Sequence, residues 1–121
     1  MNFDVNSPID VVPPDIYQKI LDKSRKMRSA FSNISKIILF GSYATGTAKT
    51  DSDIDLAVFL KSESNFFLDE YRVFVKICKD PVHDFQIQVF NDIELESPCG
   101  IVDEIISFGF TIDGQDTLTI G

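Results

Sequence analysis

The stretch Leu39-Phe40-Gly41-Ser42, followed after ten residues by Asp53-Ile54-Asp55-Leu56, decides how this chain folds. The run 36–40 is short and almost continuously apolar, which predicts a strand covered on both faces. Gly41 lets that strand turn sharply and leaves bare backbone for a phosphate group to approach. Ser42 then opens a short helix or turn, where free N–H groups favour an anion. The first half of the stretch therefore predicts a phosphate-binding turn.

The second half of the stretch holds two carboxylates close together. Asp53 and Asp55 are two residues apart in a predicted strand over 53–60, so both side chains point the same way. The opposite face of this strand is apolar and anchors it in the core through Ile54, Leu56, Val58 and Leu60. Two such carboxylates repel each other unless a cation lies between them, and Mg²⁺ prefers carboxylates combined with substrate phosphates. Together, the two halves are suited to metal-assisted phosphoryl-group transfer.

The rest of the chain alternates helical and strand patterns. Apolar spacing predicts helices over about 14–32, 68–80 and 100–108 and strands over 36–40, 53–60 and 84–90. In the last helix, Ile101, Ile105 and Phe108 fall on one face. This order predicts an α/β fold, with a small mixed sheet of three or more strands flanked by about four helices. We expect a single domain over 1–121, with its core at about 14–110.

Composition narrows the classes of function. The chain has 121 residues and a formal net charge of −8. Its largest basic group is expected on a solvated outer face of the first helix: Lys19, Lys23, Arg25, Lys26 and Arg28. A protein that grips a phosphate backbone needs a basic face, so we expect no direct binding to nucleic acid. Short apolar runs and two cysteines favour a cytoplasmic protein without membrane contact or a disulfide framework.

The spacing of Gly41-Ser42, ten residues and then Asp53-Ile54-Asp55 resembles the signature of the DNA polymerase β-like nucleotidyltransferase superfamily. The resemblance is greatest to its small prokaryotic members, the minimal nucleotidyltransferases, and it extends over the order of elements from about 14 to 110. It implies transfer of a nucleoside monophosphate, by default AMP from ATP, with release of pyrophosphate and with two Mg²⁺ ions. By this resemblance Asp53 and Asp55 hold the metal ions, while Gly41 and Ser42 bind the triphosphate.

The third carboxylate of this family lies on a later strand, for which the chain offers alternatives. Asp84 is the only acid on the appropriate face of the third predicted strand, and we assign it as the third metal ligand and catalytic residue. A shift of two or four residues places Gln86 or Gln88 there instead, leaving a pseudoenzyme that binds nucleotide without turnover. Small members of the family often carry Arg where this chain has Thr45, which removes one cation from the phosphate side.

The resemblance also implies a protein partner. Small proteins of this kind are often antitoxins paired with HEPN-type ribonucleases, which they neutralise by binding or by attaching AMP. We therefore expect the acceptor to come from another chain, either a second copy or a different protein such as a HEPN-type toxin, and to be modified on a hydroxyl group. A plain interaction domain that keeps the fold without the chemistry is the remaining alternative, and binding of nucleotide with Mg²⁺ distinguishes it from the others.

Overall fold

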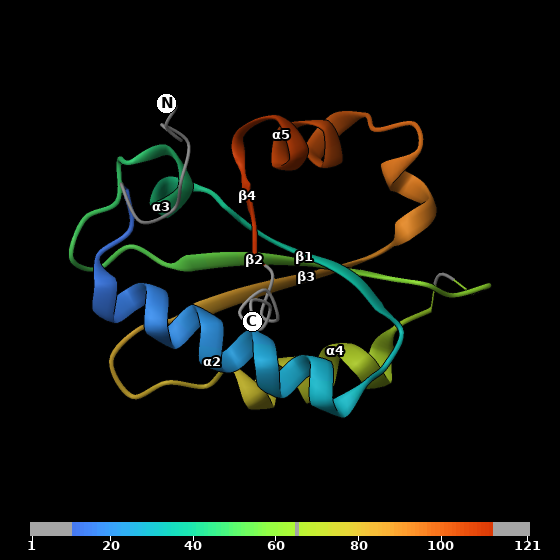
Figure 1. Cartoon of the computed structure of the whole chain (residues 1–121), viewed down its shortest axis with the longest axis horizontal. Helices are drawn as coiled ribbons and strands as arrows, with labels where there is room; N and C mark the ends of the chain where they lie inside the picture. Colours follow the sequence, from blue (N-terminus) through green and yellow to red (C-terminus); the bar gives the residue numbers. More distant parts are fainter. Residues whose placement is uncertain (1–10, 65, 113–121) are drawn as a thin grey trace, which may run out of the picture.

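The computed structural model describes residues 11–64 and 66–112, which form a four-stranded sheet with helices on both faces (Figure 1). Its elements are α2 (Pro14–Ala30), β1 (Ile34–Phe40), α3 (Ser42–Thr45), β2 (Ile54–Leu60), α4 (Leu68–Ile77), β3 (Phe85–Asn91), the 3-10 helix η1 (Asp92–Leu95), α5 (Gly100–Phe108) and β4 (Phe110–Thr111). The predicted α/β fold is therefore confirmed.

The sheet is mixed, with the strand order β3-β2-β1-β4. β2 runs antiparallel to β1 and parallel to β3, and β4 runs antiparallel to β1. β2 is thus an inner strand, and every residue of it is buried except Asp55, which is half-buried. The order of the strands consequently places this one carboxylate at the end of the most enclosed strand in the sheet.

One face of the sheet packs on α2 and α4. Pro14 stands in the first turn of α2, where its missing N–H costs nothing, and Ile16, Ile20 and Met27 form the buried stripe of that helix. The predicted anchoring face of β2 is confirmed, since four of its residues are fully buried in this core: Ile54, Leu56, Val58 and Leu60. This layer holds the larger of the two cores.

The other face of the sheet carries α5 and a smaller core. That core consists of Ile38, Ala57, Phe59, Val102 and Ile105. Phe59 also stacks on Phe90 of β3, with ring centroids 5.1 Å apart. α5 covers the middle of this face, whereas Asp53, Asp84 and Gln86 are exposed. The end of the sheet that carries these polar residues is therefore accessible to solvent, and the small core under α5 lies next to it.

Two elements were not predicted from the sequence, η1 and β4. Asn91 starts η1, because its side chain accepts a hydrogen bond from the Ile93 N–H at 3.0 Å. β4 has two residues, too few for any hydrophobic pattern, and its pairing continues at Ile112, whose N–H donates to the Ile37 carbonyl at 2.7 Å. Both depend on tertiary contacts, so a local pattern gives no sign of them.

The expected solvated face of α2 was wrong for three of its five cations, since Lys19 and Arg28 are half-buried and Lys23 is buried. Lys19 and Lys23 reach the loop that joins α4 to β3. The physical reason is that Lys23 falls in the same helical stripe as Ile20 and Met27, so its stem packs inward while its ammonium group finds oxygen partners.

Candidate functional site

Gly41 turns the chain from β1 into α3 and lies directly against a carboxylate. It has φ 79° and ψ −156°, a conformation that is essentially restricted to glycine. Its carbonyl accepts hydrogen bonds from the Ala44 N–H at 3.0 Å and the Thr45 N–H at 3.1 Å, which close the first turn of α3. A Cβ atom at this position would overlap the carboxylate of Asp55. The predicted turn thus brings Gly41 and Asp55 into one site, with Ser42 next to them as the first residue of α3.

The register of the sheet accounts for this contact. Asp55 pairs with Phe40 of β1, the residue immediately before Gly41. Any slip of β1 against β2 would separate the turn from the carboxylate. The apolar residues that fix this register, such as Leu39 opposite Leu56, therefore also determine the geometry of the site.

Asp55 is difficult to ionise in this position. Burial, and then the negative charge of nearby Asp53, raise the pKa of Asp55 from 3.8 to about 6. Asp53 itself is exposed at the mouth of the site. Two neighbouring carboxylates, one of them partly desolvated, are a donor set that fits a hard divalent cation such as Mg²⁺, because its charge would offset both burial and repulsion.

The third strand puts a glutamine, rather than an acid, next to Asp55. In the parallel pairing of β2 and β3, Asp55 lies opposite Gln86 and Ala57 lies opposite Gln88. Asp84 precedes β3, and its carbonyl accepts a hydrogen bond from the Ile54 N–H at 2.9 Å. Extending the register by one residue places Asp84 beside Asp53, where its side chain is exposed. The assignment of Asp84 as the third carboxylate stays a prediction.

Within residues 11–64 and 66–112, no three His, Cys, Asp or Glu side chains are gathered closely enough to hold a metal ion by themselves. What these residues offer is the Asp53–Asp55 pair beside Gly41, with Asp84 attached to the same strand through its backbone. None of the helices in these ranges combines the length and apolar character needed to cross a bilayer.

A hollow of about 360 Å³ opens beside Gly41, between α3 and α5. Its walls include Phe40, Thr45, Ile101 and Phe108. The predicted common face of Ile101, Ile105 and Phe108 is confirmed, because all three line this hollow, although only Ile105 is buried. A second hollow of about 380 Å³ also borders Thr45 and Phe108, so both hollows lie between α3 and the end of α5.

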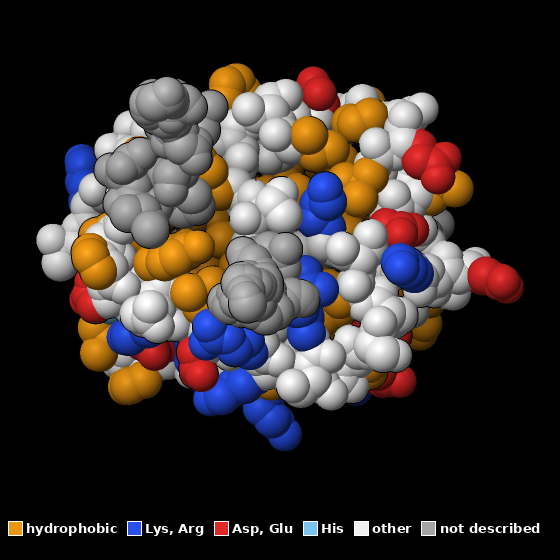
Figure 2. Space-filling view, viewed as in Figure 1, with side chains coloured by type: hydrophobic (Ala, Val, Ile, Leu, Met, Phe, Trp, Pro, Cys, Tyr) orange, Lys and Arg blue, Asp and Glu red, His pale blue; other side chains and the backbone are white. Residues whose placement is uncertain are grey.

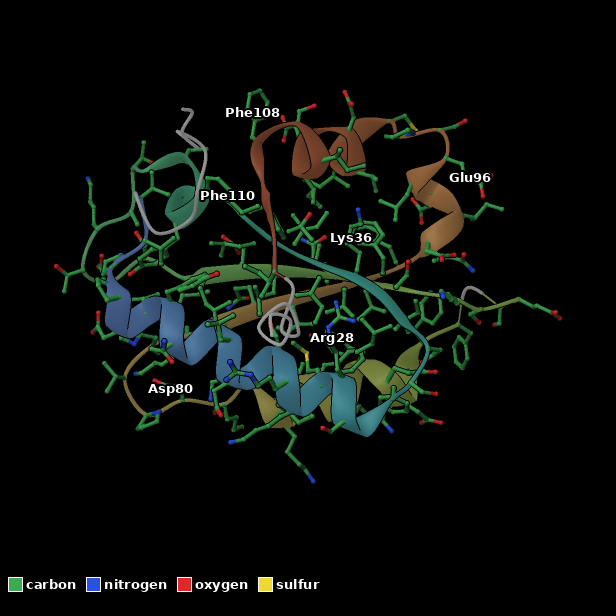
Figure 3. The ribbon with its side chains drawn as sticks, viewed as in Figure 1. Arg28, Lys36, Asp80, Glu96, Phe108 and Phe110 are labelled. Carbon is green, nitrogen blue, oxygen red and sulfur yellow. The ribbon has the colours of Figure 1, made fainter. Side chains whose placement is uncertain are left out.

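A partly buried ion pair holds the loop that leads to Asp84. The Asp80 carboxylate accepts hydrogen bonds from Lys19 Nζ at 2.8 Å and from the backbone N–H groups of Val82 at 3.0 Å and His83 at 2.9 Å. The Lys19 hydrogen bond, followed by those of the backbone, holds the pKa of Asp80 well below its usual range in spite of burial. Asp80 is labelled in Figure 3, in the loop next to α2.

Asp84 lines a hollow of about 450 Å³ under this loop, but Gly41, Asp53 and Asp55 do not line it. We therefore locate the site by its carboxylates and its turn rather than by the size of a cavity. Sequence reasoning missed the Asp80 cluster. The one feature of the sequence that indicated this cluster was the position of Lys23 within the apolar stripe of α2.

Three comparisons with known proteins bear on the family and the fold of this chain. Residues 17–107 match the model of the family described as nucleotidyltransferase domain. A protein of Methanocaldococcus jannaschii, provisionally assigned as a protein adenylyltransferase, is 36% identical over 72 residues, which are 58% of this chain and 49% of the relative. The match thus spans about half the length of that relative.

Two crystal structures have a similar fold. One, provisionally assigned as a nucleotidyltransferase, comes from Sulfolobus solfataricus and has a TM-score of 0.54 at 19% identity, covering 92% of this chain and 89% of the other. The second is described as a toxin–antitoxin with AMP-PNP and has a TM-score of 0.52 at 20% identity, covering 80% and 75%. At these identities the two structures establish the fold alone.

Proposed function

The chain belongs to the nucleotidyltransferase domain family, and on that premise we propose that it transfers AMP from ATP to a hydroxyl group of a protein. The observation that carries the proposal is the contact between Gly41 and the Asp55 carboxylate, which joins a glycine turn to a pair of acids. The assignment of the M. jannaschii relative supports AMP transfer, and the toxin–antitoxin neighbour supports a protein as acceptor.

In the proposed reaction, the acceptor hydroxyl oxygen attacks the α-phosphorus of ATP. A new oxygen–phosphorus bond forms, the bond from the α-phosphorus to the bridging oxygen breaks, and pyrophosphate leaves. Gly41 and Ser42 receive the triphosphate on the backbone at the start of α3, and Asp84 takes the proton of the hydroxyl. Asp53, Asp55 and Asp84 would hold two Mg²⁺ ions, which supply charge stabilisation and orientation when bound.

Incubation with ATP and Mg²⁺ tests this proposal. The protein encoded by the neighbouring gene serves as the acceptor, in parallel reactions with α-labelled and γ-labelled ATP. We expect the α-label alone to move to the acceptor, and Asp53→Asn to abolish the transfer. Transfer of the γ-label would indicate a kinase and would contradict the proposal.

Gln86 favours a second candidate, a nucleotide-binding partner protein without turnover. If the residue opposite Asp55 provides the third ligand, Gln86 supplies an amide where the chemistry needs an acid. Two variants separate the candidates. Under our proposal Asp84→Asn lowers transfer by about 10²-fold or more, while Gln86→Glu brings no gain. Activity that appears only in Gln86→Glu would establish the second candidate.

A further inference from the structure

The charges of the chain are separated along its sequence. All eleven Lys and Arg residues lie at or before Lys79, and the chain from Asp80 onward contains nine Asp and Glu residues and no Lys or Arg. η1 and α5 belong to this acidic part, whereas five cations lie on α2. Figure 2 shows several Lys and Arg side chains gathered around α2 and several Asp and Glu side chains along the edge of α5 and η1. Lys36 of β1 is a cation on the α5 side, where it lines a hollow with Leu95 and Ile106.

The acidic side also exposes large apolar residues. Val102 and Ile105 already anchor α5 to the sheet, so its other apolar residues have no place in that core. Phe108 is 65% exposed and Ile101 46% exposed on α5, and Ile93 of η1 is 60% exposed. Figure 3 shows Phe108 projecting outward from the end of α5 and Glu96 pointing away from the segment after η1. Exposed apolar residues flanked by several acidic side chains are typical of a protein interface.

The α5 part of this surface borders the candidate active site. Ile101, Glu104 and Phe108 line the hollow that also contains Gly41. A protein bound over α5 would therefore have its contacting residues next to the turn that receives the triphosphate, the place where an acceptor hydroxyl is needed.

We propose that the acceptor docks on this α5–η1 surface, defined by Ile93, Glu94, Glu96, Ile101, Glu104 and Phe108, through a cationic segment with an apolar anchor. The inference rests on the proposed function and deepens it, because it names the surface and the chemistry of the partner. Phe108 and Ile101 bury apolar area, and the three glutamates pair with Lys or Arg of the partner. The absence of Lys and Arg from η1 and α5 disfavours nucleic acid in the same place.

A second copy of the chain is the competing occupant, since α2 offers cations. Three of them are already engaged: Lys19 with Asp80 at 2.8 Å, Lys23 with the Lys79 carbonyl at 3.1 Å and Lys26 with Asp22 at 3.2 Å. If these cations bound the glutamates of a second copy, the free energy lost by breaking their present pairs would offset much of the free energy gained from the new ones. A different, basic protein avoids that loss.

Random copolymers of Lys and Tyr and of Glu and Tyr are suitable probes, because both present hydroxyl groups with opposite charge. Binding is measured first by fluorescence anisotropy without nucleotide, and transfer of α-labelled AMP second. The surface variants are Ile101→Ser with Phe108→Ser, and Glu96→Gln with Glu104→Gln. The matched control, Glu63→Gln with Asp69→Asn, makes the same change of charge at exposed positions around the start of α4.

We expect the Lys–Tyr copolymer to bind and the Glu–Tyr copolymer not to bind. Each surface variant should weaken binding about tenfold or more, and the control less than about twofold. The inference would be overturned if the control weakened binding as much as the surface variants did, or if the Lys–Tyr copolymer did not bind. It would also be overturned if the protein associated with itself and the surface variants abolished that association. Docking without any transfer of AMP would refute the proposed function alone, and transfer that the surface variants leave unchanged would refute the docking surface alone.

Discussion

At the scale of single residues, the site depends on a contact that no side chain larger than hydrogen would permit. Gly41 has a backbone conformation that other residues avoid, and the Asp55 carboxylate occupies the space where a Cβ would lie. Sequence reasoning identified both residues, because glycine and paired acids at this spacing carry a strong local signal. It had no means to detect that they touch, since this follows from the pairing of Phe40 with Asp55.

Gly41→Ala should destabilise the protein by about 3 kcal/mol, since it combines backbone strain with overlap on a charged group. Gly46→Ala is the matched control at the other end of α3: its φ is 80°, but a Cβ there meets only Val11 Cγ1, at 3.9 Å. The control should cost about 1 kcal/mol. Both values come from denaturant unfolding, and an equal cost in the two variants would show that the carboxylate does not press on Gly41. In a protein that also carries Asp55→Ala, the destabilisation caused by Gly41→Ala should come closer to that caused by Gly46→Ala.

Asp55→Asn should stabilise the free protein in a pH-dependent way. The folded pKa of about 6 is above the ordinary value of 3.8, so ionisation of Asp55 weakens folding. That penalty is fully present above pH 6 and fades as the pH falls towards 4. The variant should therefore gain about 1 kcal/mol over the natural protein at pH 7, after allowance for solvent screening, and little near pH 4. Thermal unfolding measured across this range tests the sign, and a gain that grows towards acid pH would contradict it.

At the scale of elements, the long periodic segments could be predicted and the short ones could not. The pattern of Ile16, Ile20 and Met27 is sufficient to define α2, and the alternation of Phe85, Ile87 and Val89 defines the inner face of β3. β4 and η1 are too short for such patterns. The position of Asp84 likewise depends on where β3 begins, and a difference of one or two residues in register decides whether an acid or a glutamine lies next to Asp55.

The loop before β3 should lose stability when Asp80 is removed. Asp80→Ala leaves Lys19 and two backbone N–H groups without their acceptor, which we expect to cost about 2–3 kcal/mol. Asp22→Ala removes the exposed partner of Lys26 from the same helix and should cost at most about 0.5 kcal/mol. Because the pKa of Asp80 is held low, its contribution is present above the ordinary aspartate pKa and is lost only in stronger acid. Equal costs in urea unfolding at pH 7 would show that the loop is not held by this pair.

At the scale of the whole molecule, the two layers on either side of the sheet differ in the size of their core and in their charge. The layer of α2 and α4 contains the larger core, and three of the five cations of α2 are paired there, whereas the layer of α5 has a smaller core, is acidic and lies next to the site. The sequence predicted the two-sided covering of the sheet from the continuous apolar run in β1. It did not predict that α5 would cover the middle of one face, because the packing of a helix on a sheet depends on tertiary contacts rather than on one segment.

The central claim is that Gly41, Ser42 and the two aspartates form one site for a nucleotide with its metal ion. Thermal unfolding with a non-hydrolysable ATP analogue, with and without Mg²⁺, tests it without knowledge of the acceptor. We predict a rise in Tm that requires analogue and Mg²⁺ together, and that disappears in Asp53→Asn and Asp55→Asn while the control Asp51→Asn retains it. No rise in the natural protein, or the same rise in the two site variants, would contradict the account.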